Sequence, residues 1–110
     1  MSESALQMNI VSALQAHGVF FFSVPNEALG KINHRGDRNR MMRLKTMGLR
    51  SGASDLVVVL PGRVMFVEVK TPTGKQSPAQ VKFQQTVEAL GHEYIVVRSV
   101  EETIDACCKP

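Results

Sequence analysis

The stretch DLVVVLPGRVMFVEVK, residues 55–70, decides the fold because it has the pattern of a β-hairpin. Two β-branched runs flank Pro61-Gly62, a pair that suits a type II turn and a loop slightly longer than a tight two-residue hairpin. If the loop is symmetric about this pair, the numbers of paired residues sum to 123. Asp55 then lies opposite Glu68, and a one-residue bulge would turn one of these carboxylates away.

Three charged residues gather at the open end of this hairpin. Side chains alternate along a strand, so Lys70 follows Glu68 on one face. Two opposed carboxylates repel each other unless positive charge lies between them. An ion pair with Lys70 is the commonest fate of such residues. A divalent cation accounts for the second carboxylate as well, because Mg²⁺ takes oxygen ligands from one or two carboxylates. The backbone carbonyl of Val69 is a candidate further ligand.

A lysine beside a bound cation has a recognisable chemical use. It can orient a water, help to deprotonate it, or stabilise negative charge as that charge develops. A cation, a water and an ammonium group together suit attack on a phosphodiester. The hairpin end therefore indicates phosphodiester chemistry.

The rest of the chain predicts one compact α/β arrangement, a mixed sheet of about four strands flanked by helices. A capping box of Ser77 and Gln80, with Pro78 at the first helical position, begins the clearest helix, whose expected buried stripe is Ala79, Phe83, Val87 and Leu90. The expected order is αβ, a basic insert, then ββαβα. Its elements are a helix from Ser2 to about His17, a strand over 19–24, an insert over about 26–50 with a short helix near 37–47, the hairpin, a helix over 77–91, a strand over 93–98 and a final helix from Ser99.

Length and composition fit a single domain over residues 1–110. The chain has 110 residues, with 44% hydrophobic and 21% charged side chains, which is ordinary for a globular protein. We see no apolar run long enough for a membrane span and no signal peptide. The two cysteines, Cys107 and Cys108, are adjacent, which suits neither a stapling disulfide nor a metal framework. We expect a cytoplasmic protein in a reducing setting.

Positive charge is concentrated in the insert. From Lys31 to Arg50 there are seven basic residues and one acidic residue, a net charge of +6, whereas the whole chain carries +3. Such a block suggests a polyanion such as nucleic acid, although a solvated loop has the same composition. The candidate DNA-binding residues are Lys31, Arg35, Arg38, Arg40, Arg43, Lys45 and Arg50 in the insert, and Lys75 after the hairpin.

Asp55, twelve intervening residues and then Glu68-Val69-Lys70 resemble the D…(D/E)-x-K signature of PD-(D/E)xK nucleases. The surroundings resemble the virus-type replication-repair nuclease domain, VRR-NUC, over nearly the whole chain. The shared features are a small G-x-x-D loop, a strand ending in E-x-K, the run TPTGKQSPAQ (71–80), a helix with L-G and the strand YIVVRS (94–99). Ser54 stands where the superfamily motif has proline, a position whose side chain is not a ligand.

The resemblance implies a restriction-endonuclease-like core and a DNA endonuclease that uses Mg²⁺ or Mn²⁺. It implies that Asp55 and Glu68 are metal ligands and that Lys70 is the catalytic lysine. It also implies that Gln80 is an active-site glutamine and Glu3 an accessory acid. Gln80 at the third helical position can equally be a cap, and an acid at the position of Glu3 is favoured by the helix dipole alone.

Three hypotheses follow. The leading one is a structure-selective endonuclease that cuts branched DNA, such as four-way (Holliday) junctions. It would act as a homodimer in a phage-infected or bacterial cell, because stand-alone, phage-sized members of the family resemble junction-cleaving dimers. The second is a DNA-binding module without catalysis that uses the basic insert. The third is a small structural protein whose hairpin charges form ion pairs. Only the first gives a reason for Asp55 to face Glu68.

Overall fold

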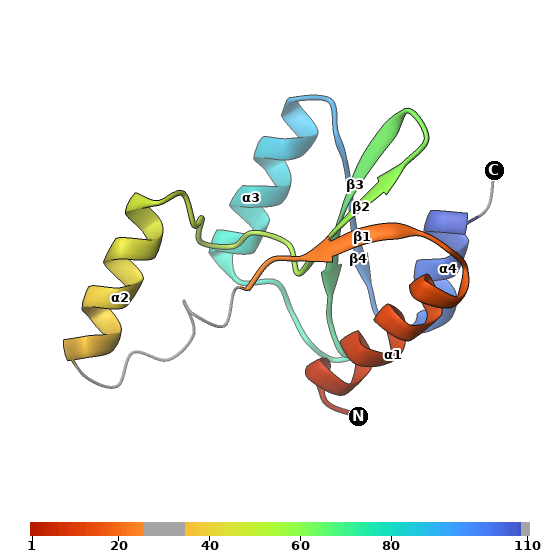
Figure 1. Ribbon diagram of the computed structural model, residues 1–110, viewed down its shortest axis with the longest axis horizontal. Coiled ribbons are helices and arrows are strands. Elements are labelled where there is room, and N and C mark those ends of the chain that lie inside the picture. The colour runs from red at the N-terminus through yellow and green to blue at the C-terminus, as the bar shows by residue number, and fades with distance from the viewer. Residues whose placement is uncertain (26–34, 109–110) are drawn as a thin grey trace.

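A computed structural model describes residues 1–25 and 35–108, with side chains in the basic segment from Arg38 onward. The predicted order of elements is confirmed (Figure 1). The helices are α1 (Glu3–Ala16), α2 (Arg35–Thr46), α3 (Pro78–Ala89) and α4 (Val100–Cys108), and the strands are β1 (Phe20–Ser23), β2 (Leu56–Leu60), β3 (Arg63–Val69) and β4 (Glu93–Val97). None of the helices in the described ranges is long and apolar enough to cross a membrane.

The four strands form one mixed sheet in the order β1-β2-β3-β4. The pairs β1–β2 and β2–β3 are antiparallel, and β3–β4 is parallel. The parallel pair requires a crossover, which α3 supplies, because parallel neighbours cannot be joined by a tight turn. The carboxyl ends of β3 and β4 therefore lie at one edge of the sheet.

The hairpin has the predicted register. Leu56 pairs with Val67 and Leu60 with Arg63, so each pair sums to 123 without a bulge. The expectation of a longer loop is wrong, since only Pro61 and Gly62 lie between the strands. Gly62 has φ of +72°, the value that the third position of a type II turn requires, so glycine there closes the hairpin tightly.

Helices cover the sheet on both faces (Figure 1). On one face α1 and α4 enclose the main apolar core, because Leu6, Ile10 and Leu14 pack with Val67 and with the other core residues. On the other face α3 packs through Phe83, whose ring lies 5.7 Å from that of Phe66 in an edge-on arrangement. The hairpin is thus held from both sides and gives rigid support to its open end.

The predicted buried stripe of α3 is partly wrong. Val87 is buried and Phe83 is half-buried, but Ala79 is exposed and Leu90 is 70% exposed. Leu90 is the C-cap residue of α3, where the helix ends. Helical periodicity predicts which residues share a face, but it does not predict how far along the helix the neighbouring sheet extends.

Candidate active site

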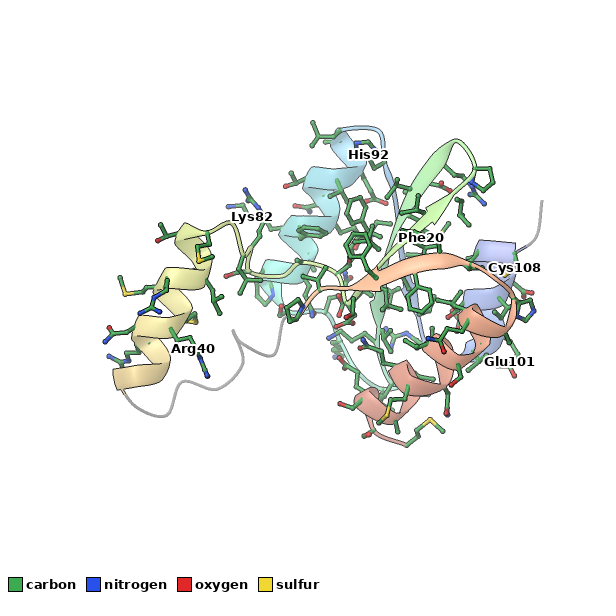
Figure 2. All side chains as sticks on the ribbon, viewed as in Figure 1. Phe20, Arg40, Lys82, His92, Glu101 and Cys108 are labelled. Carbon is green, nitrogen blue, oxygen red and sulfur yellow. The ribbon has the colours of Figure 1, made fainter. Side chains whose placement is uncertain are left out.

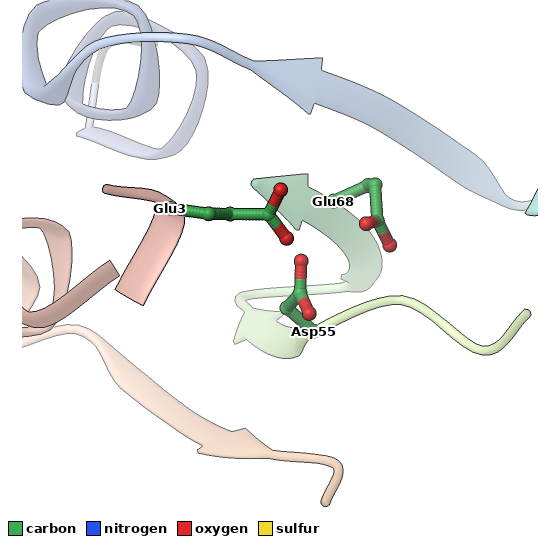
Figure 3. Close-up of side chains that lie close together, drawn as sticks. All are labelled: Glu3, Asp55 and Glu68. Atoms are coloured by element: carbon green, nitrogen blue, oxygen red, sulfur yellow. The ribbon is translucent and has the colours of Figure 1, made fainter. Parts of the chain in front are cut away.

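Three carboxylates meet at the open end of the hairpin (Figure 3). One oxygen atom from each of Glu3, Asp55 and Glu68 lies within 4.8 Å of the others. Asp55 immediately precedes β2, Glu68 lies in β3 and Glu3 lies in the first turn of α1. The hairpin register places Asp55 one step beyond the Leu56–Val67 pair, opposite Glu68 as predicted.

Glu3 reaches this cluster because α1 is anchored at both its cap and its apolar face. The Ser2 hydroxyl accepts a hydrogen bond from the Ala5 backbone N–H at 3.1 Å, which fixes the start of the helix. Leu6 and Ile10 bury the adjoining stripe against the sheet. The Glu3 carboxylate then lies 3.9 Å from the ammonium of Lys70.

Asp55 is held by the backbone of the neighbouring strand. Its Oδ2 accepts a hydrogen bond from the Val69 N–H at 2.8 Å. The Lys70 N–H donates in the opposite direction, to the carbonyl of Val97. Because no described peptide bond is cis, the Val69 carbonyl points away from β4, toward the side where Asp55 lies. The predicted carbonyl ligand is therefore oriented toward the carboxylates.

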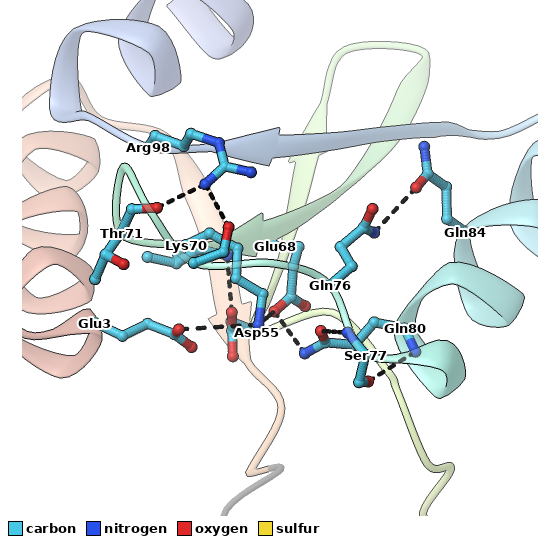
Figure 4. A network of polar contacts seen from close by, with 12 residues as sticks. Glu3, Asp55, Glu68, Lys70, Thr71, Gln76, Ser77, Gln80, Gln84 and Arg98 are labelled. Carbon is cyan, nitrogen blue, oxygen red and sulfur yellow. Dashed lines mark hydrogen bonds and ion pairs between the residues drawn. The ribbon is translucent and has the colours of Figure 1, made fainter.

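Glu68 is completely buried, which is unusual for a carboxylate. Its Oε2 accepts a hydrogen bond from Gln80 Nε2 at 2.9 Å and lies 3.7 Å from Lys70 Nζ (Figure 4). Its Oε1 has no hydrogen-bond partner among the described residues. Burial, and then the charge of Asp55, raise the pKa of Glu68 to about 8, although Lys70 opposes this shift. A buried carboxylate oxygen without a partner needs an explanation, and a bound water or cation would supply one.

Gln80 bridges helix α3 to this carboxylate. Its Oε1 accepts from the Ser77 N–H at 2.8 Å, and the Ser77 hydroxyl accepts from the Gln80 N–H at 3.2 Å. This capping box leaves Nε2 free to donate to Glu68. The two roles that the sequence offered for Gln80 thus coexist, because the cap fixes the amide orientation that Glu68 needs.

Gly52 lets the loop before Asp55 touch the first turn of α3. Its φ is +79°, and a Cβ there would lie 2.2 Å from the carbonyl oxygen of Ala79. Only glycine permits both the conformation and the contact. The G-x-x-D loop and helix α3 therefore meet backbone to backbone, and this contact fixes the position of Asp55 relative to Gln80.

Arg98 is a residue of the site that our sequence reasoning missed. Its Nη1 donates to the carbonyls of Thr71 and Gly74, at 2.6 and 2.7 Å, and so holds the loop that follows Lys70 (Figure 4). The signal was an arginine directly after the apolar strand that ends at Val97, where a charged group needs a partner. Arg98 acts on the site through the loop.

The predicted DNA-binding residues divide into those that the structure describes and those that it does not. Lys31 lies outside the described residues, as does the side chain of Arg35. The others are exposed, namely Arg38, Arg40, Arg43 and Lys45 on α2, Arg50 in the loop after it and Lys75 in the loop before α3. Figure 1 shows α2 to one side of the sheet, beyond α3.

The residues present fit a hard divalent cation. Carboxylate and carbonyl oxygens are the ligands that Mg²⁺ and Mn²⁺ prefer. Such a set is supplied by the clustered oxygens of Glu68, Asp55 and Glu3 and by the nearby Val69 carbonyl, and Glu68 Oε1 has no partner among the described residues. Lys70 provides the only ammonium group that an ion pair joins to these carboxylates in the described part of the chain.

Sequence and structure comparisons agree on the family. The sequence model of the VRR-NUC domain matches residues 1–101. The chain belongs to the VRR-NUC family. A solved VRR-NUC domain is similar over 94% of this chain and 90% of its own, with 27% identity and a TM-score of 0.63. A second solved VRR-NUC domain protein, 16% identical, covers 96% of this chain and 84% of its own with a TM-score of 0.69, and shows the same fold.

A curated relative matches a shorter region. It is named "Putative nuclease p44", from Acyrthosiphon pisum secondary endosymbiont phage 1, and is 43% identical over 51 residues. The match covers 46% of this chain and 55% of that relative, so the chain spans about half the length of the relative. The fold of this VRR-NUC chain, a mixed four-stranded sheet between helices, is PD-(D/E)xK-like, as the resemblance implied.

The buried Glu68 predicts how the stability of the VRR-NUC domain depends on pH. Its pKa is about 8 in the folded chain, against an ordinary value of 4.5, so between these pH values the folded state keeps a proton that the unfolded state has lost. The free energy of unfolding in EDTA should therefore fall as pH rises from about 4.5 to 8, by up to ~1.4 kcal/mol per pH unit. Chemical denaturation across this range measures the slope. Glu68→Gln should flatten the dependence of the free energy of unfolding on pH. Equal slopes in wild type and Glu68→Gln would show that Glu68 is not the group responsible.

Proposed function

We propose that this VRR-NUC protein is a metal-dependent DNA endonuclease. The observation that carries the proposal is the buried Glu68 carboxylate, which clusters with those of Asp55 and Glu3 beside the ammonium of Lys70 and whose Oε1 has no hydrogen-bond partner among the described residues. Family membership and the nuclease name of the phage relative support the same class. A DNA-binding module without catalysis would have no use for a buried carboxylate that faces a second one.

Each residue of the cluster has a separate task in this proposal. Asp55, Glu68 and the Val69 carbonyl hold Mg²⁺ or Mn²⁺, and Glu3 is an accessory acid. When bound there, such a cation would polarise a phosphoryl oxygen and lower the pKa of a coordinated water. Lys70 places its ammonium where negative charge develops during attack. Gln80 keeps Glu68 in one orientation, because its own amide is fixed by the helix cap.

We propose that the substrate is branched DNA, with four-way junctions as the preferred form, and that the protein acts as a homodimer inside the cell. Support for a second copy comes from β1, an edge strand whose Phe20 and Phe22 are 69% and 50% exposed. They pair with Val59 and Val57 of β2 on one face of the sheet. An apolar patch on an edge strand is typical of an association surface, and two-fold symmetry would present two sites to a symmetric junction.

One experiment tests the substrate and the metal together. The protein is incubated with four-way junction, flap, nicked and linear duplex DNA, each with Mg²⁺, Mn²⁺ or EDTA. We expect cutting with either cation, preferentially of the junction, and no cutting in EDTA or with Glu68→Ala. Light scattering on the protein without DNA should give twice the chain mass of 12.1 kDa. Cutting that persists in Glu68→Ala would contradict the nuclease assignment. Cutting of linear duplex at the same rate as the four-way junction would contradict the preference for branched DNA.

A further inference from the structure

A groove of about 390 Å³ lies between α3 and the segment that connects α2 to β2. Lys45, Arg50 and Lys82 are exposed along it, and none of the described residues that line it is acidic. Figure 2 shows Lys82 on the side of α3 that faces α2. The groove therefore gathers positive charge from two parts of the chain, the basic insert and α3.

The groove has a regular wall because α3 turns one stripe toward it. Ala79, Lys82, Phe83 and Thr86 line it, and their spacing of three, four and seven residues places them on one helical face. The opposite wall is the 48–51 segment, including Leu49. Contact between Gly52 and the Ala79 carbonyl joins the two walls at one end, so their separation is set by backbone packing.

The contact between Gly52 and Ala79 also connects the groove to the acidic cluster of Glu3, Asp55 and Glu68. Ala79 precedes Gln80, whose amide donates to Glu68, and Ser51 lies four residues before Asp55. A polyanion with one phosphate at the carboxylates would therefore run on past the first turn of α3. That path leads to the basic groove, because Ala79 in its wall adjoins Gln80.

The described side chains leave these three basic groups without an ion pair. In residues 1–25 and 38–108, neither Lys45, Arg50 nor Lys82 forms one, whereas Arg63 is paired with Glu93 at 2.7 Å. Basic side chains that lack acidic neighbours and line a concave surface attract phosphates and release counterions when they bind them. Phe83 and Leu49 add an apolar surface suited to the sugar part of a nucleic-acid strand.

We infer that this groove binds the DNA backbone next to the phosphodiester that is cut, with Lys82 and Arg50 contacting phosphates. The inference rests on the proposed nuclease function and adds to it a binding surface on α3. Phosphate contacts position a strand without reading its sequence. The groove would therefore fix the direction in which the cut strand leaves the acidic cluster.

The test is DNA binding in EDTA, where no cutting interferes. Anisotropy of labelled four-way junction DNA is measured between about 50 and 200 mM KCl for wild type, Lys82→Gln, Arg50→Gln and Arg63→Gln. Each variant loses one positive charge, but Arg63 lies at the turn end of the hairpin. We expect Lys82→Gln and Arg50→Gln to bind roughly tenfold more weakly and to lower the salt slope by about 1. Lys82→Arg should bind within a few-fold of wild type.

The outcomes separate the groove from the nuclease function. If wild type cuts DNA but the Lys82→Gln and Arg50→Gln curves superimpose on that of Arg63→Gln, the groove assignment is overturned and the nuclease assignment stands. If wild type binds neither junction nor duplex DNA at low salt, both fail. A tenfold loss confined to the two groove variants supports the inference even if the preferred substrate proves to be another branched DNA.

Discussion

Lys70→Met is expected to lower the rate of DNA cleavage on the order of 10³-fold while cation binding survives. The ammonium of Lys70 lies 3.7 Å from Glu68 and 3.9 Å from Glu3, so it is beside the proposed ligands without being one. Methionine fills a similar volume at this buried position but carries no charge. The measurement is single-turnover cleavage, together with the rise in melting temperature on adding Mg²⁺ or Mn²⁺.

Glu68→Gln is the matched comparison for this prediction. It should lose both the cleavage and the cation-dependent rise in melting temperature, because an amide is a poorer ligand than a carboxylate. Glu101→Gln, on the exposed side of α4, should change neither. Cleavage by Lys70→Met within tenfold of wild type would remove Lys70 from the chemistry, and loss of the cation response in that variant would make its role structural.

Gly52→Ala is expected to lower the stability of the fold by at least about 3 kcal/mol. A Cβ at this position would lie 2.2 Å from the Ala79 carbonyl oxygen and 2.3 Å from its carbon, and these backbone atoms can move only if α3 moves. The positive φ adds roughly 1 kcal/mol for any residue with a side chain. Thermal unfolding should show a decrease in melting temperature of about 10 °C or more.

Gly62→Ala is the control, because it separates the cost of the positive φ from the cost of the collision with α3. Gly62 has φ of +72° but nothing within 4 Å of an added Cβ, so it carries the conformational cost alone. Its melting temperature should fall by only about 4 °C. Gly52→Ala should also weaken the response to Mg²⁺, since the collision displaces Asp55 relative to Gln80. Equal losses in the two variants would show that the contact with α3 is unimportant.

Much of the site could be predicted from the hairpin alone. Pro61-Gly62 closes the turn, and the strand register then brings Asp55 opposite Glu68 with Lys70 next along the same face. These residues are local in sequence, and strand alternation is a geometric rule that packing does not override here. The capping box of Ser77 and Gln80 was predictable for the same reason, because its atoms lie within one helical turn.

Contacts between distant elements could not be predicted in this way. The sequence predicted a first helix from Ser2 to about His17 but not the position of Glu3 against Lys70, which depends on how α1 packs across the sheet. It also suggested that Leu90 is buried, although α3 ends there and leaves it exposed. The positions of Arg98 beside the 71–74 loop and of Lys82 opposite the 48–51 segment likewise depend on packing between distant parts of the chain.

The sequence by itself determined the hairpin, its register and the meeting of two carboxylates with a lysine, because short-range backbone geometry decides all three. Only the tertiary structure decided that Glu68 is fully buried, that one of its oxygens has no partner among the described residues and that Glu3 and Gln80 complete its surroundings. Burial depends on helices that pack on both faces of the sheet, and desolvation by those helices is the main cause of the raised pKa of Glu68. The packing of these helices buries the carboxylate of Glu68 beside that of Asp55 at the open end of the hairpin, and this burial makes the pair a candidate metal site.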